Sequence, residues 1–138
     1  MKRCYILAVF IFLFSLLFVA CPKVVFNTAS PEIKYVQVYD ENGNSLEDLT
    51  FEVTVDTEKL EDVEISKMSS YKDDDGNVIP TYMLYSKRFA YMLTWREYTL
   101  SEVKENTLIT VSKDGYKSVT FKHGDYDTYL AEVVLEAE

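Results

Sequence analysis

Apolar residues recur at every second position in one segment, and this period constrains the fold more than any other feature of the chain. Leu49, Phe51, Val53 and Val55 alternate with threonine or acidic residues. A β-strand places successive side chains on opposite faces, so this spacing suits a strand with one buried face and one wet face. Residues 49–56 are therefore predicted to form a half-buried strand.

Further short strands are predicted on both sides of this segment. They comprise residues 33–40, 63–65, 108–111, 116–121 and 129–135, which are rich in β-branched or aromatic side chains. Turns are predicted at 41–44 and 112–115, because both contain glycine with Asn or Asp, which tolerate positive φ. Acidic neighbours around 63–65 suit a strand at a sheet edge. This series predicts an all-β fold, a single antiparallel β-sandwich.

Two structures compete for residues 82–95. Apolar side chains alternate from Phe89 to Trp95 as in a strand, whereas the spacing of Arg88, Tyr91 and Trp95 also fits one face of a helix. We favour the strand, because tyrosine, threonine, phenylalanine and tryptophan crowd the segment. Residues 99 and 102 have the spacing of a capping box, which predicts a turn or two of helix after it.

The first twenty-one residues have the pattern of an export signal. Lys2 and Arg3 precede an apolar run from Tyr5 to Ala20, and Pro22 ends it. The cationic side chains favour the cytoplasmic face, so the run would enter the membrane with its amino end inside. It falls short of the roughly 20 apolar residues that a spanning helix needs. We therefore expect cleavage rather than a permanent span.

The end of this run, Phe18-Val19-Ala20-Cys21, resembles the lipobox of bacterial lipoproteins. Val19, Ala20 and Cys21 match that motif, whereas Phe18 stands where leucine is usual. The resemblance implies a diacylglycerol on the Cys21 sulfur and a further acyl chain on its nitrogen. The chain then divides into a signal peptide at 1–20, a lipidated cysteine with its tether at 21–31, and a sandwich domain at 32–138. The alternatives are an uncleaved anchor and simple secretion after a cut elsewhere.

Charge and cysteine content limit what the exported part can be. Lys2 and Arg3 leave with the leader, so 12 of the 14 basic residues remain against 23 acidic ones, and the net charge changes from −9 to −11. Such a surface is unsuited to nucleic acid and to lying flat on anionic lipid. Cys4 also leaves and Cys21 would carry lipid, so no disulfide is expected within the domain. The hydrophobic core alone must hold the fold.

Two segments have the motifs of a known sandwich domain. Residues 36–46, VQVYDENGNSL, contain a strand and a D-x-x-G turn, and residues 107–117, TLITVSKDGYK, contain a strand that leads to a Gly-Tyr pair. The chain thereby resembles carboxypeptidase regulatory-like and transthyretin-like domains, and the PEGA family shares the second motif. The resemblance implies an Ig-like or transthyretin-like sandwich used as a noncatalytic module. Residues 57–106 exceed what those domains require and could hold an insertion.

Residues suited to catalysis are sparse. His123 is the only histidine, and turn chemistry beside Gly124 explains its position. If Cys21 is modified, no free thiol remains to act as a nucleophile, and a single histidine allows few nucleophile–histidine pairs. Many carboxylates are present, but no pattern in the sequence would give two neighbouring carboxyl groups the different pKa values that acid–base catalysis requires. We expect neither enzymatic activity nor a cofactor.

An acidic run at residues 73–75 precedes Gly76 and Asn77. A hard cation such as calcium could relieve the repulsion between these carboxylates. In an EF-hand register, however, tyrosines occupy the first and twelfth positions, where acidic ligands belong. A solvated turn is therefore favoured over a calcium site. Asp73 and Asp75 are the weak candidates for such a site, which Asp125 and Asp127 could complete.

Aromatic residues are the other candidate for a binding site. Tyr91, Trp95 and Tyr98 lie near charged residues 96 and 97, so an exposed patch that stacks on sugars or anchors a protein competes with burial in the core. We expect a noncatalytic binding or scaffolding lipoprotein, held on the exported side of the bacterial cell membrane or outer membrane. Its partner would be an envelope protein or a glycan. The alternative is a carbohydrate-binding or surface-adhesion lipoprotein that uses the aromatic patch.

Overall fold

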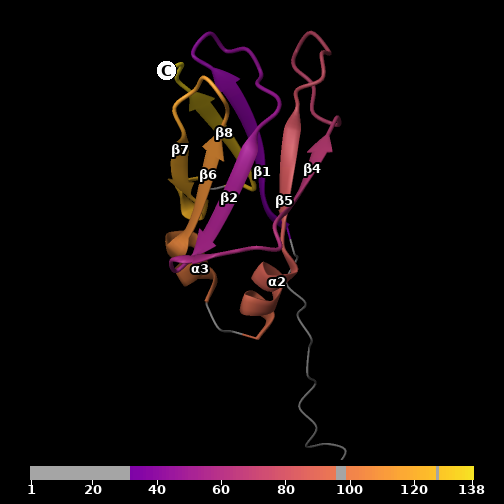
Figure 1. Ribbon diagram of the computed structural model, residues 1–138. Coiled ribbons are helices and arrows are strands. Elements are labelled where there is room, and N and C mark those ends of the chain that lie inside the picture. The colour runs from indigo at the N-terminus through magenta and orange to yellow at the C-terminus, as the bar shows by residue number, and fades with distance from the viewer. Residues whose placement is uncertain (1–31, 96–98, 127) are drawn as a thin grey trace, which may run out of the picture.

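Two four-stranded sheets form most of the protein (Figure 1), whose computed structural model describes residues 32–95, 99–126 and 128–138. The first sheet has the order β4 (Glu64–Met68), β5 (Thr81–Tyr85), β1 (Glu32–Asp40) and β8 (Leu130–Leu135). The second has the order β3 (Glu58–Lys59), β2 (Thr50–Val55), β6 (Thr107–Ser112) and β7 (Val119–Lys122). Helices α2 (Lys87–Thr94) and α3 (Leu100–Asn106) lie at one end, and a short 3₁₀ turn, η1 (His123–Asp125), contacts α3.

The two sheets share one hydrophobic core. Phe51, Val53 and Val55 of β2 are buried while the residues between them are exposed or half-buried, as the alternation predicted. Their sheet meets the other through the Phe51 and Tyr82 rings, whose centroids lie 5.4 Å apart. Burial of such side chains contributes about 1.5–3 kcal/mol each, so this core can hold a domain without a disulfide.

Most of the predicted strands are confirmed. The segments predicted at 33–40, 49–56, 108–111 and 129–135 correspond to β1, β2, β6 and β8, and 63–65 overlaps β4 at the edge of the first sheet. The segment predicted at 116–121 is shorter than expected, because β7 begins at Val119 and Tyr116 makes only an isolated bridge to Ala137.

The prediction of a wholly antiparallel fold is wrong for one pair of strands. β1 and β8 are parallel, with Val36 opposite Ala131 and Val38 opposite Val133. The reason lies in the connection before β8. β7 returns the chain to the end of the molecule where β1 begins, and η1 then leads it into the first sheet, so β8 runs in the same direction as β1.

The prediction of a strand through residues 82–95 is wrong beyond Tyr85, where α2 replaces it. Ser86 caps this helix, because its hydroxyl oxygen accepts a hydrogen bond from the Phe89 N–H at 3.0 Å. Asp62 completes the cap by accepting from the Ser86 hydroxyl at 2.7 Å and from the Arg88 N–H at 2.9 Å. Burial opposes ionisation of Asp62, but these hydrogen bonds outweigh it and lower its pKa.

The short helix predicted after residue 99 is confirmed as α3. Thr99 accepts from the Glu102 N–H at 3.2 Å, and the Thr99 N–H donates to the Glu102 carboxylate at 2.7 Å. This reciprocal pair is the capping box that the spacing predicted. Within the ranges described above, no helix is long and apolar enough to cross a membrane.

Candidate functional site

Two exposed aromatic side chains and one half-buried arginine lie on the outer face of α2. Trp95, at the end of the helix, is 65% exposed and Tyr91 is 48% exposed, and their ring centroids lie 6.0 Å apart. The Arg88 guanidinium lies over the Tyr91 ring, 5.4 Å from its centroid. We call Arg88, Tyr91 and Trp95 the α2 surface. It offers two exposed rings for stacking, one of which lies under the Arg88 guanidinium.

The opposite face of α2 fixes this surface to the core. Phe89 and Met92 are 3% and 1% exposed, and the Phe89 ring stacks on His123 with a centroid separation of 6.1 Å. Residues three and four apart on a helix share a face, so burying positions 89 and 92 turns positions 88, 91 and 95 outward. The α2 surface is thus presented by a packed helix rather than by a loop.

The structure brings together two of the three predicted patch residues, Tyr91 and Trp95, and leaves both in solvent. Tyr98 lies outside the described residues. Arg88 was not predicted as part of the patch. Its spacing from Tyr91 identifies it only if the segment is taken as a helix, in which residues three apart are neighbours.

The α2 surface lies at the end of the domain where β1 begins. Glu32, the first described residue, is paired with Tyr85, and the Ser86 cap of α2 follows directly. Ile33 provides a second connection, because its carbonyl lies 2.9 Å from Nε2 of His123, which stacks on Phe89 of α2. The first residue of β1 therefore lies beside the start of α2 (Figure 1).

A buried lysine holds the β7–β8 connection against β1 near this end. The Lys34 side chain is 1% exposed, and its Nζ donates to the carbonyl oxygens of His123, Tyr126 and Thr128 at 3.0, 3.1 and 2.7 Å. Three donors on one ammonium match these three acceptors. Nζ also lies 5.8 Å from the centroid of the Tyr126 ring. These contacts point the lysine inward, so it is a structural group rather than a surface ligand.

His123 is buried beside this lysine, not exposed in a catalytic cleft. Because the Ile33 carbonyl can only accept, Nε2 must carry the proton in the neutral ring. Nδ1 then holds the lone pair, and it is buried with no hydrogen-bond partner among the described residues. Burial lowers the pKa of His123, and the nearby Lys34 and Lys104 add to this, although the bond to Ile33 opposes it.

Stability is expected to fall as the pH drops below about 6.5, the ordinary pKa of histidine. The unfolded chain binds a proton in this range before the folded protein does, so the free energy of unfolding rises with pH there and levels off above it. His123→Gln retains an amide donor for the Ile33 carbonyl but does not titrate. Urea melts at a series of pH values should show a weaker dependence between pH 7 and 5 in this variant. Equal slopes in the two proteins would contradict the assignment.

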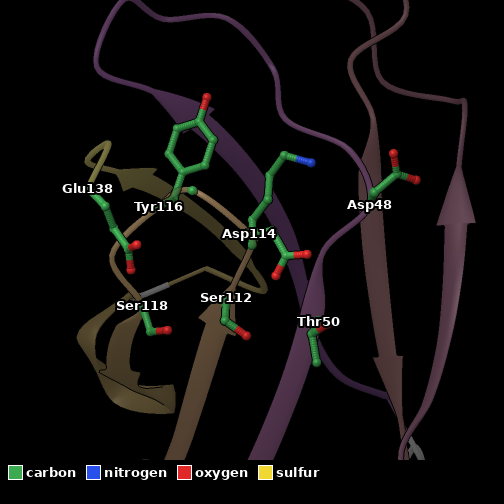
Figure 2. Close-up of a pocket in the computed structure, with 9 residues that line it drawn as sticks. Asp48, Thr50, Ser112, Asp114, Tyr116, Ser118 and Glu138 are labelled. Carbon is green, nitrogen blue, oxygen red and sulfur yellow. The ribbon is translucent and has the colours of Figure 1, made fainter.

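An open polar hollow of about 440 Å³ lies at the opposite end of the domain (Figure 2). Its walls come from the segment before β2, from the β6–β7 connection and from the last residue. The polar side chains among its lining are Asp48, Thr50, Ser112, Lys113, Asp114, Tyr116, Ser118 and Glu138. Two backbone hydrogen bonds hold the carboxyl-terminal wall in place, from Lys117 N–H to the Glu136 carbonyl and from Glu138 N–H to the Gly115 carbonyl. We call it the distal hollow. Its hydroxyls and carboxylates could accept hydrogen bonds from amino or hydroxyl groups of a ligand.

The candidate calcium residues lie in a turn that is closed by its own hydrogen bonds. Asp73 accepts at both carboxylate oxygens, from the Asn77 N–H at 2.8 Å and the Asn77 side-chain amide at 3.0 Å. The side-chain and backbone donors of Asn77 lower the Asp73 pKa. Asp75 precedes Gly76, which adopts a φ of 84°. Asp125 lies in η1 at the other end of the domain, and Asp127 is outside the described residues.

The turn at residues 40–44 has the same construction. Asp40 accepts from the Asn42 and Asn44 N–H groups and from the Asn44 side chain, at 2.8–2.9 Å, and Gly43 adopts a φ of 82°. Both turns have the sequence D-x-x-G-N, so the acids at 40 and 73 serve turn geometry. In the described part of the chain, no group of three or more histidine, cysteine or acidic side chains is placed to hold a metal ion.

The predicted lipidation site, Cys21, and the lipobox residues Phe18, Val19 and Ala20 lie outside the described residues. Comparison of the chain with protein-family models, with curated proteins and with solved structures gave no match.

Proposed function

We propose that this protein is a noncatalytic binding or scaffolding lipoprotein of the bacterial cell envelope, anchored through lipid on Cys21. The observation that carries the proposal is the leader, in which two cations, a sixteen-residue apolar run and Val19-Ala20-Cys21 follow one another. The acyl chains would hold the domain on the exported side of the cell membrane or outer membrane. Each buried methylene contributes about 0.8 kcal/mol, so two or three chains give durable attachment.

The arrangement of the domain supports this proposal. Ten residues, 22–31, separate Cys21 from β1, and β1 begins at the α2 end. The distal hollow lies at the opposite end, where β1 and β6 finish. A ligand or protein partner could therefore reach the hollow without approaching the bilayer. An envelope protein or a glycan is the class of partner that this placement suits.

The positions of the reactive groups support a noncatalytic role. His123 is enclosed by Ile33, Lys34 and Phe89 at the α2 end, whereas the distal hollow contains carboxylates and hydroxyls. General acid–base work needs a titrating group within hydrogen-bond reach of a substrate. The buried imidazole does not offer this.

We also propose that the two sheets form an Ig-like or transthyretin-like sandwich. The D-x-x-G turn after β1 and the Gly-Tyr pair after β6 support this, since both occupy the connections that the resemblance implies. Gly115 adopts a φ of 83° in the second connection. The parallel β1–β8 pair and helix α2 are additions to that pattern.

A carbohydrate-binding or surface-adhesion lipoprotein is the second candidate. The exposure of Trp95 and Tyr91 on one helical face favours it, because exposed rings at this separation can stack on sugar faces. We rank it second because the part of the chain that the structure describes places only two of the predicted rings together, and a guanidinium covers one of them.

Replacing Cys21 with alanine is expected to abolish lipid attachment. Bacterial cells expressing the full chain would be fed radiolabelled palmitate, and the mature amino terminus would be analysed by mass spectrometry. The wild type should carry label on a polypeptide that begins at Cys21, and Cys21→Ala should carry none. Cys4→Ala is the matched control and should be labelled normally, because residue 4 lies in the leader. A wild-type protein with a bare Cys21 thiol and an intact leader would refute the proposal.

A further inference from the structure

We propose that the outer face of the first sheet binds a neutral polysaccharide chain, through the rings of Tyr35 and Tyr39 and the polar group between them. The inference deepens the binding role proposed above, on which it rests, by naming a ligand class and a surface. It uses neither the α2 surface nor the distal hollow.

Alternate residues of β1 and β5 form the middle of this outer face. Val36 and Val38 of β1 and Tyr82 and Leu84 of β5 are buried in the core. Successive side chains of a strand point to opposite faces, so the residues that alternate with these four point away from the core. They are Tyr35, Gln37, Tyr39, Thr81 and Met83, with Tyr35 directly opposite Met83. We call these five residues the tyrosine face.

A hydrogen-bond network fixes the middle of the tyrosine face. Gln37 Nε2 donates to the Thr81 hydroxyl at 2.9 Å, and that hydroxyl donates to the Ile79 carbonyl at 3.1 Å. The Tyr39 hydroxyl donates to Gln37 Oε1 at 2.9 Å. Because Gln37 is two residues before Tyr39 on the same face, this bond makes the Tyr39 ring lie along the strand rather than stand upright on the sheet. The ring is therefore held in place before a ligand binds, which lowers the entropic cost of binding.

The outer face of the second sheet has a different composition. Phe51, Val53 and Val55 of β2 point inward, so the residues between them and their partners on β6 point outward. These outward residues are Thr50, Glu52, Thr54, Leu108, Thr110 and Ser112. They carry hydroxyls, a carboxylate and one leucine, whereas the tyrosine face carries two rings, an amide and a thioether. Both faces border solvent, so solubility alone does not explain the rings.

The tyrosine face is uncharged in a chain of net charge −9. Acidic residues lie only at its margin among the outward residues that the structure describes. Glu32 and Glu64 both pair with Tyr85 in the row nearest α2, and Glu132 lies opposite Gln37 on the edge strand β8. An acidic domain repels anionic polymers, so an uncharged chain is the polymer that this face suits. The exposed Glu132 carboxylate can accept a hydrogen bond from a sugar hydroxyl.

The size of the face argues against a globular partner. Four strands span about 14 Å, and Tyr35 and Tyr39 lie about 13 Å apart along β1, so the area is on the order of 200 Å². A stable protein complex buries about 800 Å² on each partner. Ser66 on β4 and Val134 on β8 are both exposed, so a linear polymer can cross the sheet and continue beyond each edge. Tyrosine rings stack on the apolar faces of sugars, and the groups between them serve the hydroxyls.

Native gels that contain a neutral polysaccharide would test the inference. The protein purified from expressing cells would be run in gels with hydroxyethylcellulose, glucomannan or dextran, in a detergent that has no sugar headgroup. We expect at least one of these polymers to retard the wild type, and anionic alginate to leave its mobility unchanged. Tyr39→Ala should weaken the affinity derived from retardation about tenfold, because it removes one stacking ring.

Val134→Arg tests the same face without touching the core. Val134 is 53% exposed and lies opposite Tyr39, so an arginine there would obstruct the ring, and we expect a loss of affinity similar to that of Tyr39→Ala. Leu108→Arg is the charge-matched control, since Leu108 is 38% exposed on the outer face of the second sheet. It should bind as the wild type does. Trp95→Ala should also bind normally, because Trp95 belongs to the α2 surface.

Three results would overturn the inference. The first is a wild-type protein that none of the neutral polymers retards, even if Val134→Arg abolishes crosslinking to an envelope protein. The second is a folded Val134→Arg protein with wild-type affinity. The third is retardation that Trp95→Ala abolishes and Val134→Arg does not, which would assign glycan binding to the α2 surface. None of these results bears on lipid attachment, which the palmitate labelling of Cys21 measures separately.

Discussion

Lys34→Met is expected to lower the free energy of unfolding by about 3 kcal/mol, and Tm by roughly 15 °C. Methionine keeps most of the side-chain volume but removes the ammonium that donates to three carbonyl oxygens of the β7–β8 connection. Removal of the buried charge relieves its own desolvation, which acts in the opposite direction. The loss of the hydrogen bonds outweighs this relief, because the three carbonyl oxygens remain without a donor. An unpaired buried acceptor destabilises the fold by about 1–3 kcal/mol.

Lys72→Met is the control for this measurement. Lys72 is exposed in the β4–β5 connection, so its replacement should change the free energy of unfolding by less than about 0.5 kcal/mol. Urea melts of the three proteins at pH 7.5 would keep His123 neutral throughout. A Lys34→Met protein as stable as the wild type would show that the carbonyl contacts do not hold the connection.

Phe89→Ala is expected to destabilise the domain by about 3–5 kcal/mol. The ring is 3% exposed and lies between α2 and His123, so its removal opens a cavity under the helix that the neighbours fill only in part. Tyr91→Ala, on the exposed face of the same helix, should lower the free energy of unfolding by less than about 1 kcal/mol. Thermal melts monitored by circular dichroism would measure both. Similar losses for the two variants would mean that α2 is not fixed to the core through Phe89.

Local sequence predicts those parts of the fold whose stabilising contacts join residues close together in the chain. The alternation in β2 reports burial of one face directly, and both the D-x-x-G-N turns and the Thr99 capping box are closed by residues two to four positions away. Helix α2 could not be predicted in this way. Its cap requires Asp62, 24 residues before Ser86, and period-two and helical spacings coincide over so short a segment.

The same distinction between local and distant contacts applies to the candidate sites. The aromatic residues Tyr91 and Trp95 stood out by type, but the face they share with Arg88 depends on α2 being helical. Lys34 lies in register with Val36 and Val38, so the period places it on an inward face, yet the carbonyls that satisfy it are about 90 residues away. The distal hollow joins segments around residues 48, 112–118 and 138, which only the sheet topology brings together.

The parallel pairing of β1 with β8 has a consequence for biogenesis. β1 is an inner strand of its sheet, and its partner on one side, β8, comes much later in the chain, so the sheet cannot be completed until the segment that contains β8 has been synthesised. Pairings between segments so distant in sequence also form slowly, because a long loop must be ordered first. The first sheet is therefore completed only after β1 and β8 have met, and this delay would favour the export proposed above, because translocation requires an extended chain.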